Sequence, residues 1–134
     1  MRDYMQKMVL LARKYPLSVI CFSAVWVLSF LPFSDMGDLE EVPFIDKWTH
    51  IAMYGGACCV LWTEYVRRHR TGLDGEELFF WAWLMPVVMS GIIELLQEFC
   101  TTYRGGEWLD LAANSTGITL AVGYGLLLYR KLKK

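Results

Sequence analysis

Four stretches of the 134-residue chain contain no Asp, Glu, Lys or Arg, and they constrain the fold more than any other feature. They cover residues 17–33, 48–63, 78–93 and 111–129. Each stretch, with its flanks, approaches the roughly 20 residues that a helix needs to cross about 30 Å of hydrocarbon. Because lipid offers the backbone no hydrogen-bond partners, such segments must satisfy their own backbone groups and fold as helices. The sequence therefore predicts an all-α membrane protein.

The composition leaves no room for a soluble domain. Hydrophobic residues make up 55% of the chain, and the mean hydropathy is +0.32. The four stretches fill most of a chain that is long enough for one domain. We expect a single membrane domain, residues 1–134, built as an integral membrane bundle of four transmembrane helices over about 16–31, 46–66, 77–98 and 108–129.

The segment before the first stretch carries four basic residues within positions 1–15. A basic segment followed by an apolar run also begins a signal peptide. The sequence at 30–33, Phe-Leu-Pro-Phe, offers no small residues for cleavage. We expect the segment to be retained and to form a short amphipathic helix along the membrane surface.

Several helix ends can be placed by residue type. Pro16 suits a first helical turn, and Pro32 suits the end of a helix. Asp46 is expected to cap the second helix, because its carboxylate can accept the free amide hydrogens of the first turn. Pro86 lies within the third helix and is expected to bend it.

The basic residues predict the orientation. Eleven of the thirteen Lys and Arg residues lie at the two termini or in the loop around 67–70, whereas only Lys47 and Arg104 lie in the first and third loops. Cytoplasmic segments are enriched in Lys and Arg. We therefore expect both termini to be cytoplasmic, in a multi-pass protein of a bacterial cytoplasmic (inner) membrane, with the first and third loops on the outer side.

Small residues recur every four positions in the fourth predicted helix, at Ala113, Gly117, Ala121 and Gly125. The second helix has a shorter version in Ala52 and Gly56. Small residues let helix backbones approach closely in membranes. Packing within one four-helix bundle explains both stripes, and a homodimer face is the less favoured alternative.

The polar residues near the predicted outer ends come from three segments but belong to one membrane face. Residues three or four apart share a face of a helix, so each segment can direct at least two polar groups inward. Polar groups at the edge of a membrane are costly unless they are paired or hydrated, which makes them the first candidates for function. They are Asp46, Lys47, His50, Glu94, Gln97, Glu98, Arg104, Glu107, Asp110 and Asn114.

The order and spacing of these residues resemble a known family. The pattern Asp46-Lys47-x-x-His50, then Glu94-x-x-Gln97, then Arg104 and Asp110-x-x-x-Asn114-x-x-Gly117, is similar to that of the VanZ-like membrane proteins. The resemblance covers residues 46–125. It implies a small bacterial integral membrane protein of the cell envelope, and the family's namesake is an accessory resistance factor against the glycopeptide antibiotic teicoplanin.

Three of the polar residues are candidates for catalysis. His50, Glu94 and Asp110 could bind or transfer protons, and a histidine changes its charge close to physiological pH. The alternative for His50 and Glu94 is a buried hydrogen bond or ion pair that joins helices. For Asp110 the alternative is a carboxylate that the positive end of a helix dipole favours.

Five further residues are candidates for ligand binding. Arg104 and Lys47 could hold an anion, and a guanidinium binds phosphate oxygens in a bidentate manner. Asp46, Gln97 and Asn114 would contribute polar contacts, although Asn114 could instead form an interhelical hydrogen bond. We expect no metal: a site of His50 with Glu94 and Asp110 is the least favoured alternative, because transition-metal sites usually include a second histidine or a cysteine. No cofactor is expected.

These residues lead to two functional hypotheses. In the first, a polar pocket that opens outward at the headgroup level binds or modifies a phospholipid or an envelope precursor, with a possible link to glycopeptide tolerance. In the second, the protein is not an enzyme, and the polar residues form a structural network between helices. The lipid bilayer is the expected partner in both, a nucleic acid is not, and the sequence leaves enzymatic activity uncertain.

Overall fold

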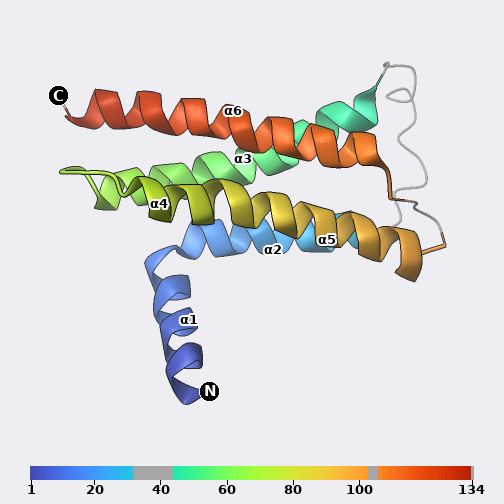
Figure 1. The fold of residues 1–134 in the computed structure, drawn as a ribbon, viewed down its shortest axis with the longest axis horizontal. Coiled ribbons are helices and arrows are strands. Elements are labelled where there is room, and N and C mark those ends of the chain that lie inside the picture. Colours follow the sequence, from blue (N-terminus) through green and yellow to red (C-terminus); the bar gives the residue numbers. More distant parts are fainter. Residues whose placement is uncertain (32–43, 103–105, 134) are drawn as a thin grey trace.

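The computed structural model describes residues 1–31, 44–102 and 106–133, and these form helices without a strand among them (Figure 1). The all-α prediction is confirmed. The elements are α1 (Arg2–Lys14), α2 (Pro16–Phe30), α3 (Ile45–Arg68), α4 (Gly75–Leu78), the π-helical segment η2 (Phe79–Leu84), α5 (Met85–Cys100) and α6 (Trp108–Lys133).

Four rods of helix lie side by side, formed by α2, α3, the α4–η2–α5 segment and α6, while α1 projects away from them (Figure 1). The chain bends by 101° between α1 and α2. The bend falls at Tyr15, directly before Pro16, because proline disfavours helical geometry in the residue that precedes it. No residue of α1 is buried, as expected for the predicted surface helix.

The third rod is continuous from Gly75 to Cys100 although its hydrogen bonding changes along the way. In η2 the amide of Met85 donates to the carbonyl of Phe80, five residues earlier. Pro86 follows in the first turn of α5, where its missing amide hydrogen costs least. The bend expected at Pro86 stays a prediction, and the structure places a π-helical segment just before this residue.

Two helices are long and apolar enough to cross a membrane, Gly75–Cys100 and Trp108–Lys133, each of 26 residues. A third span results if the bent pair α1 and α2 counts as one segment. On its own α2 has only 15 residues. Helix α3 has 24 residues but carries charged side chains near both ends. The length and apolarity of the described helices thus identify a membrane protein with two candidate spans.

The closest helix contact joins α3 to α6 through the predicted stripe of small residues. A Cβ atom added at Gly117 would lie 2.5 Å from the carbonyl oxygen of Ile51 and 3.0 Å from the amide nitrogen of Gly55. A Cβ atom at Gly125 would overlap the indole of Trp62. The stripe on α6 therefore packs inside the molecule, as the bundle interpretation predicts.

Two local predictions were wrong. Ala52 and Gly56 are exposed, and Gly55 is the α3 glycine that meets α6. Asp46 is not the cap of α3, because Phe44 occupies that position in a left-handed conformation (φ 57°) and no side chain caps the helix. The chain thus enters the helix two residues earlier than expected, and the Asp46 carboxylate is directed to other partners.

Candidate functional site

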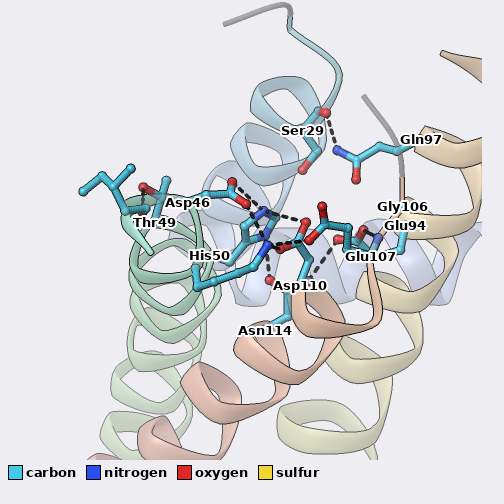
Figure 2. Close-up of polar contacts among 12 residues, drawn as sticks. Ser29, Asp46, Thr49, His50, Glu94, Gln97, Gly106, Glu107, Asp110 and Asn114 are labelled. Carbon is cyan, nitrogen blue, oxygen red and sulfur yellow. Dashed lines mark hydrogen bonds and ion pairs between the residues drawn. The ribbon is translucent and has the colours of Figure 1, made fainter. Parts of the chain in front are cut away.

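Polar side chains from three helices meet at one end of the bundle, as the sequence predicted (Figure 2). They come from the first turns of α3, the last turns of α5, and the start of α6 with the residue before it. We name the set the histidine cluster. It consists of Asp46, Lys47, His50, Glu94, Glu107, Asp110 and Asn114.

Lys47 is held by three carboxylates. Its Nζ donates to Asp46 Oδ2 at 2.9 Å and to Glu107 Oε2 at 2.8 Å, and it also contacts Asp110 Oδ1. The Lys47 side chain is 20% exposed, and that of Asp110 is 8% exposed. All three ammonium hydrogens therefore have acceptors within the protein, so Lys47 offers little charge to an external anion.

His50 is oriented by Asn114, which is fully buried. His50 Nδ1 lies 2.9 Å from Asn114 Oδ1, and Asn114 Nδ2 lies 3.5 Å from Glu94 Oε1. Because the amide nitrogen faces a carboxylate, its oxygen must face the imidazole and accept a hydrogen from Nδ1. This arrangement places the proton of a neutral His50 on Nδ1 and leaves the Nε2 lone pair free.

The free Nε2 points between two carboxylates. It lies 3.6 Å from Asp46 Oδ1 and 3.6 Å from Asp110 Oδ2 (Figure 2). Both distances exceed those of an ordinary hydrogen bond. One ligand atom from each of the three residues falls within 4.8 Å of the others, and this is the set among the described residues that could hold a metal ion.

Glu94 contacts Asn114 and the backbone before α6, and it is not one of the two carboxylates beside Nε2. Its Oε2 accepts the amide of Glu107 at 3.3 Å, and its Oε1 faces Asn114. One turn later on α5, Glu98 also binds the backbone before α6, because its Oε2 accepts a hydrogen bond from the amide of Gly106 at 2.8 Å. A side chain at Gly106 would overlap the Glu94 carbonyl. Gly106 thus lets the backbone lie close to α5.

Comparisons of the chain with protein-family models, curated proteins and solved structures found no match. The resemblance to the VanZ-like proteins therefore stays a prediction from the residues.

The candidate residues fall into three groups in the structure. His50, Glu94, Asp110, Asp46, Lys47 and Asn114 lie together. Gln97 is buried but contacts α2, where its Nε2 donates to the Ser29 carbonyl at 2.6 Å. Arg104 lies outside the described residues. Glu107 was absent from the predicted ligand-binding set, although its place beside Asp110 at the start of α6 was a usable signal.

A second polar cluster lies at the other end of α3, and sequence reasoning missed it. Glu64 accepts the amides of Leu17 and Ser18 at 3.1 and 2.9 Å and the Ser18 hydroxyl at 2.5 Å. It thus satisfies free amides at the start of α2. The signal was a helix that begins at Pro16 without a cap of its own. We name Leu17, Ser18 and Glu64 the glutamate cluster.

Tyr15 lies beside the glutamate cluster, outside the membrane-spanning segments. Arg68 sits 5.8 Å from the centre of the Tyr15 ring. Burial raises the pKa of the Tyr15 hydroxyl, the nearby Glu77 carboxylate adds to that increase, and Arg68 opposes it. These contacts attach the bend between α1 and α2 to the end of α3.

Proposed function

We propose that the chain is a VanZ-like, multi-pass protein of a bacterial inner membrane, with four transmembrane helices and both termini in the cytoplasm. The two candidate spans support the membrane part of this proposal. Helices α2 and α3 lie alongside them in the same bundle (Figure 1). The distribution of Lys and Arg supports the orientation, which places the histidine cluster at the outer headgroups.

At that face, the histidine cluster binds the polar headgroup of a phospholipid or an envelope precursor and exchanges a proton with it. The observation that carries this proposal is the geometry of His50. Asn114 fixes the imidazole from one side, so that Nε2 on the other side can accept a proton from a bound water or hydroxyl group. Asp46 and Asp110 beside Nε2 stabilise the imidazolium that results.

Recognition of a phosphate in this proposal falls to Arg104. Lys47 is engaged with three carboxylates, so Arg104 is the remaining basic residue of the predicted site. A guanidinium suits two phosphate oxygens at once. A contribution to glycopeptide tolerance follows from the family resemblance and belongs to the same proposal.

Lipid binding by the full chain in nanodiscs tests the proposal. The probe is a phosphatidylglycerol of defined acyl chains, competed against phosphatidylcholine. We expect Arg104→Lys and His50→Gln to reduce the preference for the anionic lipid, and His69→Gln, at the far end of α3, to leave it unchanged. An unchanged preference in both site variants would exclude a headgroup site here.

The second candidate is a structural role, and the saturated contacts of Lys47 favour it. Under this reading the cluster joins α3, α5 and α6 without a ligand. Thermal stability in detergent separates the two candidates. A structural network predicts that His50→Gln and Glu94→Gln lower the melting temperature while the lipid preference is unchanged. A headgroup site predicts that His50→Gln changes the lipid preference even where the melting temperature is retained.

The orientation can be tested through Cys100, the exposed cysteine at the end of α5. With Cys21, Cys58 and Cys59 replaced by alanine, a membrane-impermeant maleimide should label Cys100 from the outside of intact cells. Labelling that occurs only in inverted membrane vesicles would reverse the orientation and place the histidine cluster at the cytoplasmic face.

A further inference from the structure

We propose that Asp46, His50 and Asp110 bind a divalent transition-metal ion of the zinc type at the end of the bundle. The ligands would be Asp46 Oδ1, His50 Nε2 and Asp110 Oδ2. Binding of the ion does not depend on the headgroup function, whereas its use in headgroup chemistry rests on that proposed function.

The spacing of the ligand atoms suits such an ion. Nε2 lies 3.6 Å from each carboxylate oxygen. Two ligands at about 2.1 Å from a tetrahedral zinc ion are about 3.4 Å apart. Nε2 and each oxygen therefore need only a small contraction, and the ligand atoms of the three residues all lie within 4.8 Å of one another. At 3.6 Å, the contacts from Nε2 to the two oxygens are longer than hydrogen bonds.

The residues around the three ligands hold them in the orientation that a metal requires. Asn114 accepts the Nδ1 hydrogen of His50, and metal-bound histidines are commonly fixed by such a contact on the second nitrogen. Lys47 binds Oδ2 of Asp46 and Oδ1 of Asp110. Those are the opposite oxygens from the pair that faces His50, so the lysine fixes both carboxylates without blocking the inner oxygens.

The local charge also favours a cation. Among the described residues, three carboxylates surround the ammonium group of Lys47, so the negative charges of this group outnumber the positive one. His50 is 7% exposed on its side chain, and Nε2 faces this excess without a hydrogen bond. A divalent ion would balance the carboxylates and give Nε2 a partner.

The ligand set indicates which ion is expected. One imidazole and two carboxylates suit zinc, which accepts nitrogen and oxygen ligands in tetrahedral sites. Magnesium prefers six oxygen ligands in an octahedron and retains its waters. Three protein ligands leave a fourth position for water, which a bound zinc ion makes more acidic and hence more reactive.

Zinc titration of the full chain tests the inference. The protein is purified in detergent, stripped with a chelator and titrated with Zn²⁺ by calorimetry. We expect one ion per chain, with His50→Gln and Asp110→Asn weakening binding by about 100-fold or more. Asn114→Ala should weaken it by about 10-fold, as losses of supporting contacts do. His69→Gln serves as the matched histidine control and should bind as the unaltered chain does. Mg²⁺ should not displace the bound zinc.

A second readout identifies the ligands directly. Co²⁺ added to the stripped protein should give the intense visible absorption of a tetrahedral site with nitrogen and oxygen ligands, and His50→Gln should remove it. If Asp110→Asn does not fold, Asp46→Asn replaces it, because the Asp46 side chain is 52% exposed. Asp46→Asn should also weaken zinc binding.

Several outcomes would overturn the inference. It fails if the unaltered chain binds no zinc, if His50→Gln binds zinc as tightly as the unaltered chain, or if His69→Gln abolishes binding. A chain that binds no zinc but keeps its preference for phosphatidylglycerol would refute the metal site and retain the headgroup function. A chain that binds zinc at His50 without any headgroup preference would retain the metal site and refute the headgroup function.

Discussion

The two ends of α3 handle buried polar groups in opposite ways. At the end near His69, the Glu64 carboxylate accepts hydrogen bonds from two backbone amides and a hydroxyl, all within 3.1 Å. At the end near Phe44, His50 Nε2 faces carboxylate oxygens at 3.6 Å without a hydrogen bond. The Glu64 carboxylate accepts three hydrogen bonds, whereas Nε2 of His50 faces its two carboxylate oxygens beyond hydrogen-bond distance.

This difference separates a structural polar contact from a candidate site. A saturated carboxylate stabilises the helix start that it caps and has nothing left to offer a ligand. A buried nitrogen lone pair that faces carboxylate oxygens costs free energy until a proton or a cation lies between them. Variants at the two ends should therefore differ in whether they change stability, ligand binding or both.

The largest loss of stability is expected for Lys47→Met. It removes the only ammonium group in the histidine cluster and leaves Asp110, 8% exposed, without its basic partner. Breaking a buried ion pair costs about 3–5 kcal/mol, and we expect about 2–4 kcal/mol here because Lys47 is partly exposed. Equilibrium unfolding in mixed micelles, followed by circular dichroism, measures the change.

The control for this variant is Lys131→Met on the exposed last turns of α6, which should leave the stability unchanged. If Lys47→Met is as stable as the control, the three carboxylates around Lys47 are not all negatively charged. The excess negative charge on which the metal proposal depends would then also be absent.

Glu64→Ala should cost about 1.5–3 kcal/mol in the same unfolding assay. It removes one acceptor of three hydrogen bonds to a charged group and uncovers the start of α2. Zinc binding should be unchanged, because the glutamate cluster lies at the far end of α3. Glu76→Ala, an exposed acid at the start of α4, is the control. A loss of zinc binding in Glu64→Ala would show that the two ends are coupled.

Gln97→Leu should cost about 1–2 kcal/mol, because it removes the buried hydrogen bond from Gln97 to the Ser29 carbonyl. This residue lies near the histidine cluster but contacts α2 instead. We therefore expect the variant to lose stability and to retain both zinc binding and lipid preference. Weaker lipid preference would return Gln97 to the ligand-binding set in which the sequence placed it.

Tyr124→Phe should have the smallest effect, about 0.6 kcal/mol, typical of one interhelical hydrogen bond in a membrane. The Tyr124 hydroxyl lies 2.8 Å from the Oγ1 atom of Thr63, the α3 residue directly before Glu64. Its removal calibrates the cost of an ordinary polar contact in this bundle. A loss as large as that of Glu64→Ala would mean that the Glu64 contacts stabilise the protein no more than an ordinary interhelical hydrogen bond does.

The helices could be predicted closely from the sequence because apolar stretches and charged flanks determine them. The observed bounds differ from the predicted ones by up to about four residues, the largest difference being at the end of α6, where Arg130 and Lys131 continue the helix. The start of α3 was misjudged because the left-handed Phe44 gives no signal in residue type.

The sequence predicted which residues gather at the candidate site, but not which of them contact one another. Helical spacing correctly gathered Asp46, His50, Asp110 and Asn114 at one end. It could not show that Lys47 is surrounded by acids or that Gln97 turns towards α2, because both depend on how the helices rotate against one another. That rotation follows from packing such as that of Gly117, which residue periodicity alone does not specify.

The contact at Gly117 also has a mechanical consequence. Its Cα lies where any added carbon would meet the backbone of α3 at Ile51, the residue directly after His50. Asn114 lies one helical turn before Gly117. With no side chain between the two backbones to compress or rotate, α3 and α6 have little freedom to slide, and the distance from His50 to Asn114 is set by main-chain atoms. The backbone contact at Gly117 therefore also fixes the relative position of His50 and Asn114, which lie within one turn of it.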